Sequence, residues 1–183
     1  QELENSDLPT GRRTVTEMFL KLEGGMRMFA SHNLSGFTGV IPVAKDGKIY
    51  LFAYNHNTTR SSTNAKTIYP RLEGNQISNN TTWKMNEWTI DKDHSVLMNE
   101  LYSDIRNAGV GEKLNGRIYG NRPSDRFEDG WVNVLNSNLS KYEELSKLAQ
   151  TVNDSIVSTE DSQLTLKVDL APHSVKLIEL TPE

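Results

Sequence analysis

The spacing of apolar residues changes along the chain, from a helical period near the start to a period of two further on. In residues 12–22 the apolar side chains recur at i, i+3, i+4 and i+7, and two glycines follow at Gly24–Gly25. This spacing puts the apolar residues on one face of a helix, and the glycines end that helix. The residues of this face are Val15, Met18, Phe19 and Leu22. From Gly36 onward the period is two, which is typical of β-strands.

The first strands form the clearest pattern. "FTGVIPV" (37–43) and "IYLFAYN" (49–55) are separated by "KDGK", and Asp46–Gly47 is a strong signal for a tight hairpin turn. The segment "IYLFAY" is almost continuously apolar, which predicts a central strand that is covered on both faces. A polar loop, "NHNTTRSSTN", follows at 55–64.

Further short strands are predicted along the rest of the chain. In "TTWKMNEWTID", Trp83 and Trp88 fall in opposite phase, so a β-bulge is expected at Asn86–Glu87. Pro70 places the strand around it at a sheet edge or a strand end. "QLTLKVDL" and "HSVKLIEL" are predicted to form a closing pair of strands with a tight connection between them. The other candidates are "AKTIYPRLEG" (65–74) and "WVNVL" (131–135).

Helices are expected at 94–107, where Gly109 ends the apolar stripe, and at 136–150, with Asn138 or Ser137 as N-cap. The glycine-rich stretch 109–130 is predicted to be a long loop. The expected fold is mainly β, an antiparallel β-sandwich with two or three short helices. Residues 1–25 would form a leader and a helix, and 26–183 a single sandwich domain with a loop or helix insertion near 109–150.

Composition narrows the possible functions. The 183 residues carry a net charge of −4 and no cysteine. Disulfides and thiolate chemistry are therefore excluded. No basic block indicates a nucleic-acid partner, and no apolar run is long enough to span a membrane. We expect no cofactor. The polar start "QELENSDLPTG" resembles a mature end or an internal cut.

The densest cluster of reactive side chains is "DKDHS", residues 91–95, between a predicted strand and a predicted helix. Asp93 is placed to cap the helix, and Asp91 to accept from the same turn or from the His94 ring. Two carboxylates and an imidazole can also bind a cation or act as acid and base. We interpret the cluster as a junction held by capping carboxylates, because Val96 stands where a calcium loop needs glycine.

Other catalytic patterns are absent from the sequence. The four histidines lack zinc-site spacing, and no nucleophile elbow or dinucleotide fingerprint occurs. Glu87 with Asp91, or Asp125 with Glu128 and Asp129, offers a pair of carboxylates for glycoside hydrolysis, but nothing in the spacing singles them out. We therefore assign no catalytic and no metal-binding residue.

Three tryptophans, Trp83, Trp88 and Trp131, have flat apolar faces that can stack on sugar rings. Large aromatic residues in the strands of a sandwich are more often core, and we favour that interpretation. They are nevertheless the candidate carbohydrate-binding residues of the chain.

Four segments in order resemble the C-terminal part of glycoside hydrolase family 39, the β-xylosidase and α-L-iduronidase group. "TVTEMFLKLEGGMRMFA" resembles the last helix of that family's barrel, and "GFTGVIPVAKDGKIYLFAYNHN" resembles the hairpin that opens its accessory sandwich. "WTIDKDHSVLMNELYSDIRNAG" and "LTLKVDLAPHSVKLIEL" resemble a strand-to-helix passage and the closing strands. The resemblance covers most of 14–110 and 163–181, and 111–160 has no clear counterpart.

The resemblance implies a retaining glycosidase whose two catalytic glutamates precede the matched region. The acid/base of that family lies in an Asn-Glu-Pro motif. Asn99–Glu100 is not this motif, because Leu101 follows it within a predicted helix. The helix at 12–22 would close the barrel in the whole protein, so its apolar stripe is expected to lack a partner within this chain.

The sequence therefore predicts a non-catalytic accessory β-sandwich that packs on and supports a (β/α)8 catalytic barrel absent from this chain. The alternative is a free-standing carbohydrate-binding module that uses exposed aromatic residues. The expected partners are the barrel and an oligo- or polysaccharide, and a secreted or cell-envelope location is favoured over the cytoplasm.

Overall fold

The computed structural model describes residues 11–34, 36–59, 61–110 and 129–183. The described residues form two compact units. The larger, β-rich unit contains residues 15–94 and 148–183, and the smaller, helical unit contains residues up to 14 and 95–147. Most of the loop expected at 109–130 lies outside the described residues.

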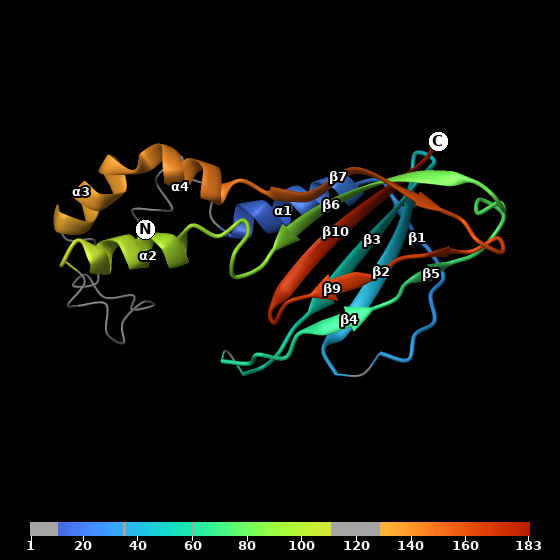
Figure 1. Cartoon of the computed structure of the whole chain (residues 1–183), viewed down its shortest axis with the longest axis horizontal. Coiled ribbons are helices and arrows are strands. Elements are labelled where there is room, and N and C mark those ends of the chain that lie inside the picture. Colours follow the sequence, from blue (N-terminus) through green and yellow to red (C-terminus); the bar gives the residue numbers. More distant parts are fainter. Residues whose placement is uncertain (1–10, 35, 60, 111–128) are drawn as a thin grey trace. The chain divides into compact units, whose positions relative to one another are not determined.

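A six-stranded antiparallel sheet forms the main layer of the larger unit (Figure 1). Its strand order is β1-β2-β3-β10-β6-β7, so β3 is central, as its continuous apolar run predicts. The strands of this sheet are β1 (Met26–Arg27), β2 (Thr38–Lys45), β3 (Lys48–Asn55), β6 (Thr82–Ile90), β7 (Ala149–Ser158) and β10 (Ser174–Pro182).

Two small ladders form the second layer of the sandwich. β4 (Lys66–Ile68) pairs with β9 (Val168–Leu170), and β5 (Arg71–Leu72) pairs with β8 (Leu164–Thr165). Their apolar side chains pack with those of the main sheet into one core, because each strand turns alternate side chains inward. The largest contributors from the main sheet are Ile49, Leu51, Trp83, Ile178 and Leu180. The predicted antiparallel β-sandwich is confirmed.

Helix α1 (Gly11–Leu22) confirms the first predicted element. The expectation that its apolar stripe lacks a partner in this chain is wrong. Met18 is fully buried and packs with Val43, Phe52 and Leu177 on the face of the main sheet that points away from the sandwich core. α1 thus covers part of that face, and Phe19 stacks on Phe52 while remaining half exposed.

The hairpin turn predicted between the first strands is present. Asp46 and Gly47 have φ values of 51° and 75°, the left-handed pair that a tight two-residue hairpin turn requires. The β6–β7 ladder shifts register on both sides of Glu87, but the extra residues lie on β7, and β6 pairs with β10 in unbroken register. The bulge predicted within β6 at Asn86–Glu87 is therefore wrong. Trp83 faces the sandwich core and Trp88 the α1 side by regular alternation along β6.

The C-terminal strands depart from the prediction in two ways. β9 and β10 lie in different layers, because β9 pairs with β4 whereas β10 pairs with β3 and β6. β7 was not predicted, since "AQTVNDSIVS" is mostly polar. An edge strand with mainly exposed side chains carries no clear apolar alternation, so its sequence gives little signal.

The described residues 95–110 and 129–147 of the smaller unit contain the helices α2 (Met98–Asn107), α3 (Asp129–Ser137) and α4 (Leu139–Ser146). The strand predicted at 131–135 is wrong, because these residues lie in α3. Gly109 has a φ of 72° just beyond α2, as expected for a residue that ends a helix. Asn138 is the N-cap residue of α4, although its side chain donates instead to the carbonyl of Val134. The helices enclose Leu97, Leu101, Ile105 and Tyr142.

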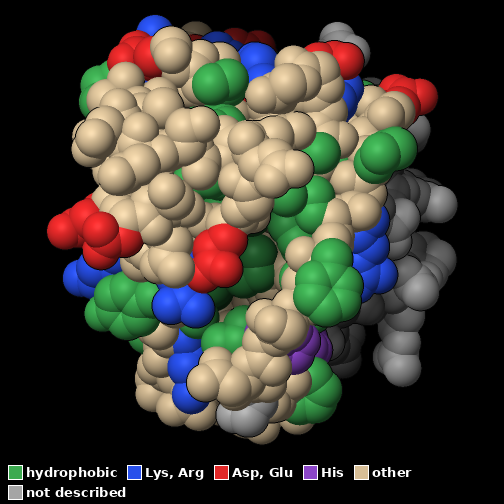
Figure 2. All heavy atoms as spheres, turned by 90° about the vertical axis from the view of Figure 1, so that its right-hand side faces the viewer, with side chains coloured by type: hydrophobic (Ala, Val, Ile, Leu, Met, Phe, Trp, Pro, Cys, Tyr) green, Lys and Arg blue, Asp and Glu red, His purple; other side chains and the backbone are tan. Residues whose placement is uncertain are grey.

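The exposed surface carries isolated apolar side chains. On the face drawn in Figure 2, hydrophobic side chains are interspersed with charged and other polar groups. Phe29, at 96% exposure, is the most exposed of the large apolar residues. Among the helices of the described residues, none is long and apolar enough to cross a membrane.

Candidate functional site

The Asp91–His94 pair forms a compact turn at the end of β6. One oxygen of Asp91, Oδ1, accepts from the backbone N–H of Asp93 and of His94, both at 2.8 Å. The same oxygen lies 2.9 Å from Nδ1 of the His94 ring. Asp91 thus orients the imidazole, which agrees with the expected role of the pair in the junction.

The capping role predicted for Asp93 is wrong. α2 begins only at Met98, with Leu97 as N-cap and no side-chain hydrogen bond at that cap. The chain instead turns through Ser95, whose φ is 61°. Asp93 is exposed and lies 3.4 Å from Lys92. The helix predicted from residue 94 begins four residues too early. Leu97 is buried and fits the apolar spacing of a helix, but it lies before the first helical residue.

Glu87 lies in a buried polar network. In the β10–β6 register it is opposite Ile178, so it shares the inner face of the main sheet. Its Oε1 accepts from Lys176 Nζ at 2.7 Å and from the Thr151 hydroxyl at 2.6 Å. The Thr89 hydroxyl lies 2.7 Å from that of Thr151. The charge of the Glu87 carboxylate is therefore balanced by Lys176, and only 7% of the residue is exposed. Neither of the two hollows described below is lined by Glu87.

A second polar network lies on the opposite face of the main sheet. The hydroxyl of Tyr50 donates to Oε2 of Glu179 at 2.7 Å, and Lys48 lies 3.3 Å from the same oxygen. Burial works against the charge of Glu179, but the hydrogen bond from Tyr50 and the charge of Lys48 hold its pKa below the ordinary range. Burial, together with Glu179, raises the pKa of Tyr50.

The remaining acidic candidates are exposed or lie outside the described side chains. Glu100, on α2, has half of its side chain exposed and pairs with Lys141 at 3.2 Å. Asp125 and Glu128 lie outside the described residues, and nothing is described of the Asp129 side chain. Among the described residues there is no group of three or more histidine, aspartate or glutamate side chains arranged to hold a metal ion.

The three tryptophans are core residues to different degrees. Trp83 is 2% exposed in the sandwich core, and its indole Nε1 has no partner among the described residues. Trp88 is partly buried beneath Lys21, whose Nζ lies 4.2 Å from the ring centroid. Trp131 packs among the helices and donates to the carbonyl of Val110 at 2.6 Å. A buried ring offers no face to a sugar in solution, so this arrangement favours the interpretation as core.

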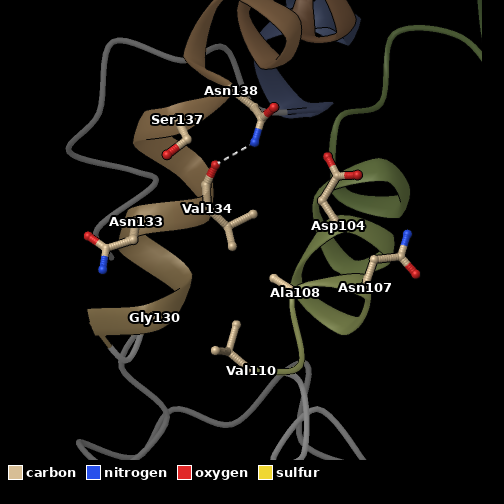
Figure 3. Close-up of a pocket in the computed structure, with 9 residues that line it drawn as sticks. All are labelled: Asp104, Asn107, Ala108, Val110, Gly130, Asn133, Val134, Ser137 and Asn138. Carbon is tan, nitrogen blue, oxygen red and sulfur yellow. Dashed lines mark hydrogen bonds between the residues drawn. The ribbon is translucent and has the colours of Figure 1, made fainter.

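The helical unit contains a hollow of about 570 Å³ between α2 and α3 (Figure 3). Ala108, Val110 and Val134 point into it, whereas the amides of Asn107 and Asn133 point away. Asp104 at its rim is already held by the Tyr142 hydroxyl at 2.6 Å and by Lys141 at 2.9 Å. The hollow therefore lacks a set of polar groups that converge on one point, which a specific ligand site needs.

A second hollow, of about 320 Å³, lies in the loop after β3. The described residues that line it all carry amide or hydroxyl groups: Asn57, Thr59, Ser61, Ser62, Thr63 and Asn64. Arg60, within the same loop, lies outside the described residues. The sequence identified this segment only as a polar loop. Its density of Asn, Ser and Thr was the available signal, but the residues that lie beside it come from distant parts of the chain and depend on strand pairing.

Comparison with known proteins gives structural likeness without sequence likeness. No family model matches the chain, and no curated protein matches it in sequence. The chain is similar in structure to part of a bacterial orthologue of human α-L-iduronidase, with 11% identity, a TM-score of 0.52, and coverage of 80% of this chain and 22% of that one.

Two further crystal structures show the same likeness. One is the GH39 enzyme of Xanthomonas axonopodis pv. citri, with 12% identity, a TM-score of 0.54, and coverage of 91% and 29% of the two chains. The other is a monomeric β-xylosidase of Caulobacter crescentus CB15, with 14% identity, a TM-score of 0.51, and coverage of 90% and 29%. At these identities the likeness shows the fold alone: most of this chain has a fold that glycoside hydrolases contain as less than a third of their length.

Proposed function

We propose that the chain is a non-catalytic accessory β-sandwich of a glycoside hydrolase, which packs on and supports a (β/α)8 catalytic barrel outside this chain. The observation that carries the proposal is the one-sided coverage of the structural likeness. Between 80% and 91% of this chain corresponds to only 22–29% of the glycosidases. By analogy of fold, we expect this chain to be one domain of a larger enzyme and to support that enzyme's catalytic domain.

The state of the carboxylates supports the non-catalytic role. A retaining glycosidase needs two carboxyl groups about 5–5.5 Å apart that face the scissile bond. Glu87 is buried against Lys176, Asp91 is used by its own turn and His94, and Glu100 lies on an exposed helix face beside Lys141. Each of these groups is occupied by a local partner. The retaining glutamates implied by the family resemblance would therefore belong to the barrel.

Turnover assays on the purified 183-residue chain test the proposal. We expect no hydrolysis of aryl β-xylosides or aryl α-L-iduronides above the buffer rate. Hydrolysis that copurifies with the folded chain and is lost in Glu87→Gln or Glu100→Gln would overturn it.

The supporting role is tested separately with the protein that the gene encodes. We expect a barrel that carries Asn-Glu-Pro, and we expect removal of residues 26–183 to lower its melting temperature or make it aggregate. A gene product without a barrel, or a barrel whose stability is unchanged by the deletion, contradicts the supporting role.

A further inference from the structure

Three aromatic rings line up at one end of the main sheet. Thr38 pairs with Asn55, and Asn55 pairs with Ser174, in the registers of β2, β3 and β10. One step beyond the strands, the same registers place Phe37 opposite His56, and His56 opposite His173. The ring centroids lie 5.6 Å apart for Phe37 and His56 and 6.1 Å apart for His56 and His173. All three side chains are exposed, Phe37 to 53%.

This aromatic row borders the polar hollow of loop 57–64. Nε2 of His173 lies 3.0 Å from the carbonyl oxygen of Thr59, one of the residues that line the hollow. The backbone N–H of His56 donates to the carbonyl of Phe37 at 2.9 Å, which fixes the other end of the row. Rings and hydrogen-bonding groups from three distant segments thus form one continuous surface, at the end of the sheet where β3 leaves and β10 enters (Figure 1).

A buried asparagine holds this surface in place. Asn55 is 4% exposed, and its Nδ2 donates to the carbonyls of Asn64 at 2.8 Å and of Ala171 at 3.1 Å. Its Oδ1 accepts from the hydroxyl of Thr38 at 3.2 Å. Within the loop, Oδ1 of Asn57 accepts from the N–H of Thr59 at 2.8 Å. One amide therefore ties the loop to the turn before β10, and a surface ordered in advance loses less entropy when a ligand binds.

The chemistry of the surface selects a hydroxyl-rich ligand that also has apolar faces. Amide and hydroxyl groups both donate and accept, as sugar hydroxyls do, and exposed rings pack against the C–H faces of pyranoses. We propose that the Phe37–His56–His173 row and the hollow lined by Asn57, Thr59 and residues 61–64 form a binding site for an oligosaccharide. The choice of a saccharide rests on the proposed function, whereas the location of the site rests on geometry alone.

Titration of the 183-residue chain with xylo- and cello-oligosaccharides, followed by calorimetry and two-dimensional NMR, tests the site. We expect saturable binding, tighter for the oligosaccharide than for its monosaccharide because the row is longer than one sugar ring. Shifts should concentrate in residues 37, 56–64 and 173.

Matched variants locate the binding energy. Phe37→Ala should weaken binding by about two- to tenfold, the loss typical of one aromatic contact. His173→Asn removes a ring but keeps a residue that tolerates the φ of 55° at this position, and it should weaken binding similarly. Phe29→Ala is the control, since it removes an equally large and more exposed ring outside the row, and it should leave the affinity unchanged.

Several results would overturn the site. These are absence of binding at millimolar oligosaccharide, shifts that map to Trp88 or to the α2–α3 hollow, or equal losses in Phe37→Ala and Phe29→Ala. Circular dichroism of each variant excludes unfolding as the cause of a loss. The accessory-domain proposal fails by a different result, turnover by the isolated chain, so the two outcomes are distinguishable.

Discussion

Nζ of Lys176 on β10 lies 2.7 Å from Oε1 of Glu87 on the neighbouring strand β6, and only 15% and 10% of their side chains are exposed. This ion pair lies on the inner face of the main sheet, the same face that carries the apolar side chains of the sandwich core. The two threonine hydroxyls beside it add hydrogen bonds to the carboxylate side. The pair is thus a buried polar part of a hydrophobic core, and each charge depends on the other.

Removal of one partner of this pair should be costly. Lys176→Met leaves the Glu87 carboxylate buried without its cation, and we expect a loss of about 3 kcal/mol in the free energy of unfolding, because an uncompensated buried charge is strongly destabilising. Replacing both residues by methionine should recover most of the loss, since a well-packed apolar pair is often as stable as a buried ion pair. Urea unfolding followed by tryptophan fluorescence measures both variants.

Lys84→Met is the matched control for the lysine substitution. Lys84 lies 3.8 Å from Glu183, and both side chains are 40% exposed, so the same change should cost less than about 1 kcal/mol. Equal losses in Lys84→Met and Lys176→Met would show that the buried pair has no special role in stability.

Tyr50 and Glu179 predict a pH-dependent contribution to stability. The pKa of Glu179 is lowered in the folded chain, so the folded state is stabilised at pH values above the unfolded pKa of about 4.3, and this stabilisation is lost as the pH falls through the lower folded pKa. Tyr50→Phe removes the donor that contributes to this lowering. We therefore expect the variant to be less stable than the parent near pH 7, by about 1–2 kcal/mol, with a difference that shrinks towards pH 3.

Chemical unfolding of both proteins between pH 3 and 7 measures this difference. Tyr69→Phe serves as the control, because Tyr69 is 65% exposed, and its removal should leave the pH profile unchanged. A stability difference between Tyr50→Phe and the parent that stays constant down to pH 3 would contradict the assigned role of Glu179.

Met18 tests whether α1 belongs to the sandwich. Its side chain is fully buried against the main sheet, so Met18→Ala should lower the free energy of unfolding by about 2–4 kcal/mol through lost burial and the cavity left behind. Leu20→Ala, on the same helix but 57% exposed, should change it by less than about 0.5 kcal/mol. If both substitutions have the same small effect, the helix does not depend on this sheet.

The sequence predicts those helices and strands whose buried apolar residues recur at a regular spacing along the chain. α1, β2, β3 and β6 each have regular apolar positions, and Asp46–Gly47 has a turn chemistry that few other structures use. "WVNVL" failed because five residues hold too few periods to separate a strand from one turn of helix. The α3 assignment depends on Trp131 and Val134 packing against α2, which is tertiary information.

The candidate surface was less predictable than the fold. The local turn of Asp91 and His94 follows from residues three apart, so the sequence was enough to pair them. Phe37 and His56 meet through the β2–β3 hairpin, but His173 joins them only because β10 pairs with β3, a contact between residues more than a hundred positions apart. Pairing of that range leaves no mark in the local pattern, and the histidines appeared isolated in the sequence.

Tyr142 and Asp104 predict a local effect in the helical unit. The buried Tyr142 donates to Oδ2 of Asp104 at 2.6 Å, and this hydrogen bond, with one from Lys141, lowers the pKa of Asp104. Tyr142→Phe should raise that pKa towards the ordinary value and destabilise the unit by about 1 kcal/mol. The destabilisation should appear above the unfolded pKa and fade as the pH falls through the folded pKa, since protonated Asp104 no longer benefits from the donor.

Hydrogen exchange of α2 and α4 amides and an NMR titration of the Asp104 carboxyl measure these two effects. Lys141→Met is the comparison, because 43% of that lysine side chain is exposed and its ion pairs are screened by water. Protection of α2 and α4 should therefore fall more in Tyr142→Phe than in Lys141→Met. The opposite order would mean that the lysine, and not the buried phenol, holds Asp104 in place between the helices.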